Sequence, residues 1–414
     1  MQQPPTDRIT EADAQARPGP FAGLRVIDLG DRPGAFAAKL LADLGADVIR
    51  IEPPGGDPMR AVGPFWHDEP HPDRSLSFWF YNTSKRSLTL NLTRPAGRDI
   101  FARLAESTDV VIETAPPGEL ERLGLGYEAL KRINGRLILV SITPFGQTGP
   151  RRDWRTSGIV AEAVSGMLYV NGFPGEPPIA TPGTQAYQST GAYAAIAAVA
   201  ALLAREHTGA GQWVDISIQE ATAAAVEHVA AIFHQTGTIQ RRTGSLHWTR
   251  DCRVGTCRDG YILHCSLGDW TSLIEWVKAD GKAKDLGGAA WEDLNHRRVN
   301  STHLFDVLDE WAKDYSAADL MEGAQLRRIP YAEVRPPEAL FDDAQLRERG
   351  FFVAVPDPDL GTSVAYPGAP FRMSETPWSV RRPPRAGEHT NEILRDVVGL
   401  EAAEGERLRA DGIV

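Results

Sequence analysis

Cysteine is scarce in this chain of 414 residues, which contains only Cys252, Cys257 and Cys265. An odd number of cysteines clustered in a long chain does not form a disulfide framework, so we expect buried thiols in a reducing cytoplasm. With His264 these cysteines could instead be read as metal ligands. However, C-x4-C followed by His-Cys lacks the paired CxxC knuckles of a zinc site, and we expect no metal.

Long apolar runs are also missing. The longest, residues 192–204, is shorter than the ~20 residues that cross a bilayer and ends at Arg205. Because it is apolar at every position, it predicts a core helix packed on all sides. Residues 1–20 are polar and Pro-rich, with no apolar signal core, and predict a disordered leader. We therefore expect no membrane partner.

The chain lacks an excess of positive charge: its formal net charge is -11. This argues against broad binding to nucleic acids or anionic membranes, so any site for a phosphorylated ligand must be local. Nucleotide motifs are absent too. The stretch after the first predicted strand reads GDRPGAF rather than G-x-G-x-x-G, and no P-loop follows, which disfavours NAD and P-loop chemistry.

What is present, from Leu24 to Thr143, is an alternation of short β-branched runs with helical patterns. Such an alternation predicts right-handed crossovers and a mostly parallel sheet covered on both faces, a Rossmann-like α/β domain. The stretch WVDISI after the apolar helix adds another strand. The predicted strands and helices are LRVIDLG, GAFAAKLLADLGA, DVIRIEPP, SLTLNL, AGRDIFARLAEST, DVVIET, GELERLGLGYEALKRIN and RLILVSIT.

The later part of the chain changes character. Alternation in DGYILHCSLGDW and amphipathic patterns such as STHLFDVLDEWAKDY predict a smaller α+β unit, and the C-terminal stretch returns to two strand-like runs and a short helix. The predicted division is a leader (1–20), a large Rossmann-like domain (21–225), a small domain (226–330) and a return to the large domain (331–414).

Several separated motifs carry a family resemblance. GLRVIDLG, GADVIRIEPPGGDPMR, NTSKRSLTLNL, GRLILVSITPFGQTGP, REHTGAGQWVDISIQEA and GEHT, in this order, resemble the class III CoA-transferases, the carnitine CoA-transferase or formyl-CoA transferase family. The likeness runs from about residue 21 to 414. It implies a cytoplasmic dimer whose chains interlink like rings, and a reaction that moves CoA from an acyl-CoA to a free carboxylic acid. CoA and acyl-CoA would be substrates, with no permanently bound cofactor.

The family's chemistry demands a carboxylate that is missing here. Its Asp attacks the donor thioester to form a mixed anhydride, which CoA reopens to an enzyme thioester. That Asp lies four residues before the Gly that opens the Ala-rich helix. Counting from Gly191, the position is Tyr187, or Ala186 if one residue has been inserted. Neither forms an anhydride, so the resemblance leaves the catalytic residue unknown.

The resemblance also implies a set of CoA-binding positions. Lys85, Arg86 and Arg122 match basic residues of the family near the CoA phosphates. Arg32 and Pro33 fall where the family contacts the pantetheine or adenine portion of CoA. Thr114-Ala115 replace the family's Asn-Phe. The expected CoA-binding residues are Arg32, Pro33, Lys85, Arg86, Thr114 and Arg122.

These residues also have local explanations. Lys85 and Arg86 are compatible with a solvated turn, and Arg122 can pair with Glu119 or Glu121. The acids expected nearest the site, Glu162 and Glu220, are compatible with structural roles. A related racemase activity is disfavoured, because its His-Asp pair would fall on Ser157-Gly158.

Three hypotheses follow for the function. The chain is the nucleophile-lacking subunit of a heteromer with a homologous Asp-bearing subunit, or a self-sufficient homodimeric transferase with a replaced nucleophile, or a non-catalytic acyl-CoA-binding homologue. Trp248, Trp270 and Trp276 point to an aromatic acid such as a benzylsuccinate, although core packing explains them equally.

Overall fold

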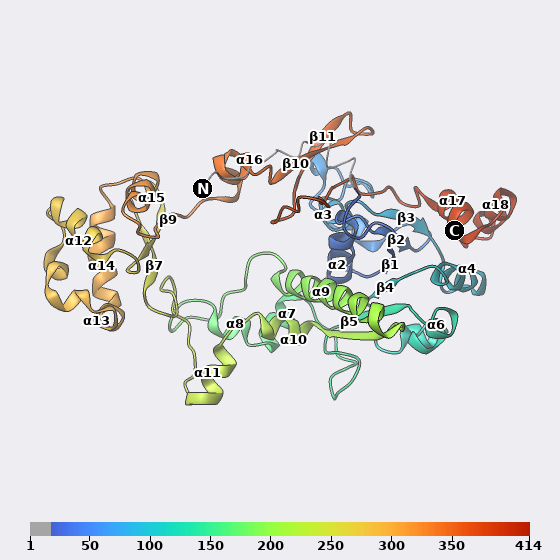
Figure 1. Cartoon of the computed structure of the whole chain (residues 1–414), viewed down its shortest axis with the longest axis horizontal. Helices are drawn as coiled ribbons and strands as arrows, with labels where there is room; N and C mark the ends of the chain where they lie inside the picture. The colour runs from blue at the N-terminus through green and yellow to red at the C-terminus, as the bar shows by residue number, and fades with distance from the viewer. Residues whose placement is uncertain (1–17) are drawn as a thin grey trace. The chain divides into compact units, whose positions relative to one another are not determined.

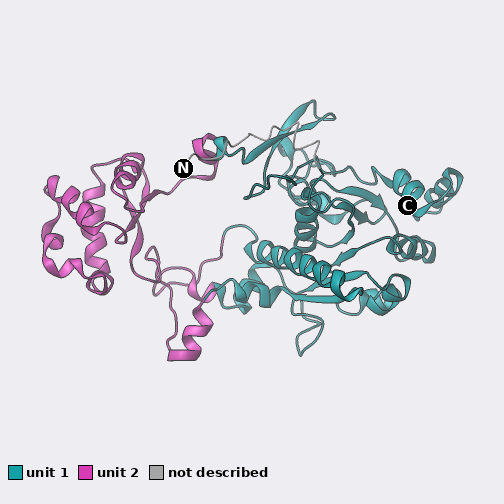
Figure 2. Cartoon of the chain, in the orientation of Figure 1, with its two compact units in different colours: residues 1–167, 182–227, 346–414 teal, residues 168–181, 228–345 magenta. Residues whose placement is uncertain are grey.

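The computed structural model describes residues 18–414, so residues 1–17 of the predicted leader lie outside the described residues. The described chain, followed from end to end in Figure 1, divides into two compact units, coloured in Figure 2. Unit 1 holds the described residues up to 167 together with 182–227 and 346–414. Unit 2 holds 168–181 and 228–345.

Unit 1 is built on a six-stranded sheet in the order β3-β2-β1-β4-β5-β6. Every neighbouring pair is parallel, and the order 3-2-1-4-5-6 is typical of doubly wound α/β sheets. The predicted α/β class is confirmed. The strands are β1 (Arg25–Leu29), β2 (Asp47–Glu52), β3 (Arg86–Thr89), β4 (Val110–Glu113), β5 (Ile138–Thr143) and β6 (Trp213–Ser217).

Helices cover both faces of this sheet because alternate strand residues are apolar on each side. Val110 and Ile112 of β4 enter one core with α2 (Arg32–Asp43) and α9 (Gln185–Thr208). Val111 enters the other, with α4 (Pro95–Ala105), α6 (Tyr127–Ile133) and α17 (Thr390–Ile393). Parallel strands buried on both faces need such two-sided cover.

Other short elements complete unit 1. The helices are η1 (Pro58–Ala61), η2 (Trp66–Asp68), α3 (Leu76–Tyr81), α5 (Glu119–Arg122), α7 (Gly158–Val164), α10 (Ile218–Ala224), η6 (Leu394–Val398) and α18 (Ala402–Ala410). The two predicted C-terminal runs form the antiparallel hairpin of β10 (Phe352–Asp357) and β11 (Thr362–Pro367). Helices α8 (Met167–Val170) and α16 (Ala344–Glu348) lie at the boundaries between the units.

Helix α9 differs from its prediction in length and in packing. It has 24 residues and, among the described helices, is the one long and apolar enough to span a membrane. One face packs in the core, whereas Ile196 and Leu203 on the other are each 64% exposed. The prediction of a short helix packed on all sides was therefore wrong, because this chain alone covers only one face of α9.

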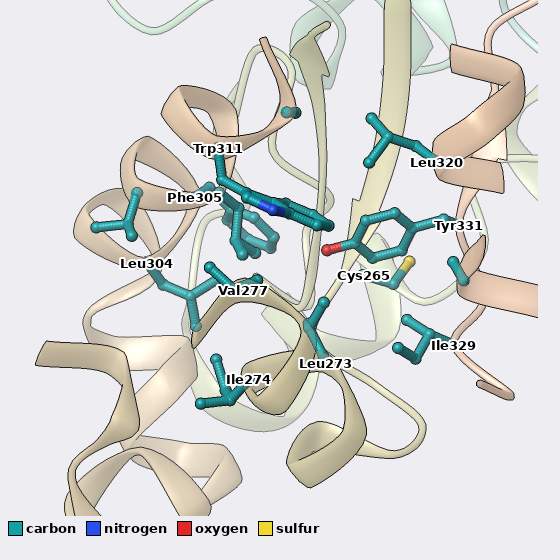
Figure 3. Packing of buried hydrophobic residues seen from close by; sticks show 14 of the residues in the cluster. Cys265, Leu273, Ile274, Val277, Leu304, Phe305, Trp311, Leu320, Ile329 and Tyr331 are labelled. Carbon is teal, nitrogen blue, oxygen red and sulfur yellow. The ribbon is translucent and has the colours of Figure 1, made fainter. Parts of the chain in front are cut away.

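Unit 2 combines a three-stranded antiparallel sheet, β7-β8-β9, with several helices. Trp311, Phe305 and Tyr331 lie in its core (Figure 3), where Trp270 is buried and Trp276 packs against it. Core packing therefore explains these last two tryptophans. The elements are β7 (Cys252–Thr256), β8 (Tyr261–Cys265), β9 (Ala332–Glu333), α11 (Val229–Thr236), α12 (Trp270–Ala279), η3 (Lys284–Gly287), η4 (Ala289–Glu292), α13 (Leu294–Val299), α14 (Ser301–Ala312), α15 (Ala317–Leu326) and η5 (Pro337–Asp342).

The unit boundaries depart from the predicted domains at three places, of which the shortest is residues 226–227, which belong to unit 1. Residues 331–345 belong to unit 2 because β9 pairs with β8. Residues 168–181, predicted to lie in the large domain, also belong to unit 2, since Arg242 donates to the carbonyl oxygens of Tyr169 and Phe173. Both are non-local contacts that the local sequence pattern does not reveal.

The expectation of three free thiols was wrong for two of them. The register of β7 and β8 places Cys252 opposite Cys265, and a disulfide joins the two. Cys257 is free and buried, as expected. The pairing depends on strand register, which the cysteine spacing did not reveal.

Candidate functional site

The candidate site lies where β1 and β4, neighbours in the sheet, end at the same edge. In a sheet of this strand order the chain reverses its winding there, and ligands bind outside the carboxyl ends of the strands. We call residues 30–35, which comprise the connection from β1 to α2 and the first turn of α2, the first βα turn. The Asp31 amide donates to Thr114 Oγ1 over 2.8 Å. This contact places Thr114 beside Asp31, the residue directly before Arg32 and Pro33.

Helix α9 crosses α2 at a glycine. A Cβ on Gly191 would lie 2.7 Å from the Pro33 carbonyl oxygen and 2.8 Å from the Phe36 ring, so only glycine permits this approach. One helical turn earlier on α9 is Tyr187. The crossing of α2 and α9 at Gly191 therefore places Tyr187 close to the first βα turn.

The Tyr187 side chain is half-buried beside three features of unit 1. Its ring lies 3.9 Å from a Cβ built on Gly158, and its phenol hydrogen-bonds to the Gly158 backbone. The phenol also interacts electrostatically with Asp31 and Arg32, and burial raises its pKa. Tyr187 is thus protonated at neutral pH. Ala186, the other possible nucleophile position, is fully buried in the core.

Asp31 is a residue that the sequence reasoning missed. Asp31 is exposed as a residue at the N-cap position of α2 and makes no capping hydrogen bond, but its carboxyl group is shielded from solvent: burial raises its pKa, and a hydrogen bond from Thr114 opposes the shift. It is the first acidic neighbour whose charge acts on Tyr187. The signal was available, because an Asp directly before Arg-Pro at a predicted helix start is a typical N-cap. Glu162, by contrast, is buried on α7, and Glu220 is exposed in the first turn of α10.

Lys85 cannot contact a ligand phosphate in this structure, which corrects the expectation. Its side chain is 0% exposed. Nζ donates to Asp28 Oδ2 (2.8 Å), the Ala35 carbonyl (2.9 Å) and Asn82 Oδ1 (2.9 Å), which uses all three of its N–H groups. Burial lowers its pKa to about 8, an effect that Asp28 opposes. The alternative expectation, that Lys85 lies in a solvated turn, is wrong as well, because its side chain is buried.

The two predicted arginines differ in availability. Arg86 donates to Asp47 over 2.8 and 2.6 Å and to Glu392 over 2.9 Å. Since Asp47 begins β2, this guanidinium lies toward the amino ends of the strands, away from the first βα turn, which corrects its assignment to the site. Arg122 is exposed and pairs with Glu119 on α5, as the local explanation held. Exposure leaves Arg122 accessible to a ligand.

Arg32 is the cation best placed for a ligand. It is half-exposed on the first βα turn and makes no hydrogen bond or ion pair with any residue between 18 and 414. An unpaired guanidinium suits phosphate or carboxylate oxygens. Within the same described range, no group of three or more His, Cys, Asp or Glu side chains is arranged to hold a metal.

Comparison with known proteins covers nearly the whole chain. The family model described as CoA-transferase family III matches residues 21–390. The succinyl-CoA:(R)-benzylsuccinate CoA-transferase subunit BbsE of Thauera aromatica is 36% identical, with 95% of this chain and 98% of that protein covered. The succinyl-CoA–L-malate CoA-transferase beta subunit of Chloroflexus aurantiacus is 32% identical, with the same coverage.

A solved structure agrees with these sequence matches. A CAIB/BAIF family protein from Brucella suis superposes with a TM-score of 0.82 at 28% identity, covering 92% of this chain and 100% of the other. Sequence motifs, fold and relatives therefore agree, and the chain belongs to CoA-transferase family III.

Proposed function

We propose that this chain takes part in moving CoA between an acyl-CoA and a free carboxylic acid as the subunit that lacks the nucleophile. Its partner would be a homologous chain that carries the Asp. The proposal rests on Tyr187, to which the count from Gly191 assigns the family's nucleophile position and which lies beside the first βα turn. A phenol cannot form the acyl anhydride that a CoA thiolate reopens.

An exposed apolar surface on unit 1 supports a partner chain. The α7–α9 face comprises Ile159, Val160 and Val164 of α7 with Tyr193, Ile196 and Leu203 of α9, all exposed by 37% to 64%. The two helices contact each other, and exposed apolar side chains gathered on neighbouring helices mark protein interfaces. Two relatives are named as subunits, which supports a homologous chain as the occupant.

The proposed CoA-binding residues are Arg32, Pro33, Thr114 and Arg122, which lie on the first βα turn or follow β4. CoA and acyl-CoA would be substrates in a cytoplasmic reaction without a permanent cofactor. Both relatives quoted above carry succinyl-CoA in their names. Succinyl-CoA is therefore the first donor to test, with aryl-substituted and hydroxylated succinates as acceptors.

The test is an isotope-exchange assay of purified chain alone and mixed with an Asp-bearing homologue. We expect this chain alone to transfer no CoA to the labelled acid. After mixing with the homologue, we expect transfer. As a matched control, the homologue carrying Asp→Ala should leave the mixture inactive. Robust turnover by this chain alone would contradict the proposal.

One observation favours the self-sufficient alternative, namely the carboxyl group of Asp31, whose charge acts on Tyr187 and whose pKa is raised by burial. If this chain alone turns over, Asp31→Asn separates the possibilities. Loss of activity in that variant would assign the replacement nucleophile to Asp31, whereas CoA binding without turnover under all conditions would favour the acyl-CoA-binding homologue.

A further inference from the structure

Two buried cations and one buried carboxylate form hydrogen bonds with the backbone of the first βα turn. Asp28, at the end of β1, accepts from the Gly30 amide over 2.9 Å and from Arg50 Nη1 over 2.9 Å. Its second oxygen accepts from Lys85 Nζ over 2.8 Å. Arg50 also donates to the Gly30 carbonyl oxygen. The backbone of Gly30 is therefore bonded at both its N–H and its C=O.

The helical end of the same turn is bonded by Lys85. Its Nζ donates to the Ala35 carbonyl oxygen over 2.9 Å, while the Ala35 amide donates to the Asp31 carbonyl over 2.7 Å. Lys85 thus connects Asp28, below the start of the turn, with Ala35, at its end. Arg32 and Pro33 lie between these two fixed points.

Burial makes this cluster sensitive to the loss of one member. Asp28 and Lys85 have side chains that are 0% exposed, and Arg50 is 5% exposed. A buried charge is tolerated only with its partners present, and removing one partner leaves the other uncompensated. The clamp of Asp28, Lys85 and Arg50 therefore fixes one conformation of the turn.

We infer that Lys85 and Asp28 are positioning residues that hold the first βα turn so that Arg32 and Pro33 face the ligand, and that neither touches the ligand itself. The expected effect on ligand binding rests on the proposed CoA binding. The expected effect on the conformation of the turn does not, since it concerns the ligand-free protein.

The test uses Lys85→Met, which keeps an unbranched side chain one atom shorter and removes its charge. The double variant Asp28→Asn/Lys85→Met removes both charges in case the single variant does not fold. Hydrogen–deuterium exchange of the peptide covering residues 25–36 should become faster in these variants without ligand. Arg205→Met is the matched control, because it removes another buried cation, paired with Asp109 over 2.9 Å, away from the turn. The control should leave exchange in residues 28–36 unchanged; Arg25 is left out of this comparison because its amide donates to Asp109 over 2.8 Å.

Calorimetry with CoA and 3′-dephospho-CoA distinguishes positioning from direct contact. A displaced turn should weaken CoA by about tenfold in the chain that keeps Arg32. If Lys85 acts only by positioning Arg32, Lys85→Met should not change the preference for CoA over dephospho-CoA, or the salt dependence of Kd, in an Arg32→Ala background. A further loss of that preference in the Arg32→Ala background would show a phosphate contact by Lys85 itself and overturn the inference. Unchanged exchange in residues 25–36 would overturn it as well. Failure of the wild-type chain to bind CoA would contradict the proposed function instead and leave the exchange result to decide the inference.

Discussion

At the scale of single residues, exposure decides which of the expected cations can reach a ligand. Lys85 is enclosed by Asp28, Ala35 and Asn82, and Arg86 is occupied by two carboxylates. Arg122 is exposed, and its partner Glu119 is a surface residue three positions earlier. Exposed ion pairs exchange partners at little cost, so a phosphate can replace Glu119.

Arg122→Ala tests this assignment. If the guanidinium binds a CoA phosphate, the variant loses a charge-assisted hydrogen bond and its affinity should fall by about tenfold to a hundredfold. Glu119→Gln is the control, since it removes the competing carboxylate and should not weaken CoA. Equal calorimetric affinities for the wild type and Arg122→Ala would refute the contact.

Glu113, at the carboxyl end of β4, carries a pH dependence. Burial raises its pKa from 4.5 to about 7, opposed by hydrogen bonds from Ser141 and from the Ala115 amide. A raised pKa in the folded state means that its stabilising contribution is complete below about pH 4.5 and is lost as the pH rises through about 7. Over that window the unfolding free energy should fall by ~1–3 kcal/mol relative to Glu113→Gln. If the unfolding free energies of the two proteins, measured by urea denaturation, change in parallel with pH, the expected role of Glu113 is contradicted.

The sequence predicted individual site residues unevenly, for a physical reason. The positions of Tyr187 and Pro33 could be assigned from the sequence, because a local count from Gly191 locates the first and a strand-to-helix transition locates the second. The role of Lys85 was not found, because Asp28 is distant in sequence and its contact depends on the packed sheet. Asp31 lay beside two predicted residues but was not singled out, since its nearness to Tyr187 arises from the crossing of α2 and α9.

At the scale of elements, the contact of α2 with α9 depends on Gly191. Gly191→Ala would place a Cβ against the Pro33 carbonyl and Phe36, and the helices would have to separate. We expect a loss of about 1–3 kcal/mol in stability. Gly405→Ala in α18 is the matched control, because its Cβ would meet only Leu394 at 3.8 Å. A helical glycine replaced without a clash should be neutral or slightly stabilising. Equal melting temperatures for the two variants would contradict this account of the crossing.

Strands and helices of the sheet were predictable because each carries its own periodicity, as in β4 and β5. The extent of α9 was not, because its first turns, from Gln185, are polar and were taken for the approach to a helix. The pairing of Cys252 with Cys265 was missed for a related reason, since it depends on the register between β7 and β8.

At the scale of the whole molecule, the α7–α9 face predicts association. We expect the protein to sediment as a dimer or larger assembly at micromolar concentration. Ile196→Glu with Leu203→Glu should lower the fraction of dimer obtained on refolding, because both side chains are 64% exposed in the chain and interlinked chains separate only when they unfold. Leu326→Glu, 78% exposed on α15, is the control and should leave the assembly intact. A monomeric wild type would refute the interface, including the interlinked ring arrangement that the family implies.

The central claim is that this chain holds no acyl nucleophile because Tyr187 replaces it. The most direct measurement is mass spectrometry of the chain incubated with succinyl-CoA and trapped with hydroxylamine or borohydride. We predict no modified residue in the wild type, and a modified Asp in Tyr187→Asp, since that variant restores a carboxylate beside the first βα turn. Trapping on Asp31, Glu162 or Glu220 of the wild type would show that another acid had taken over, and would contradict the account.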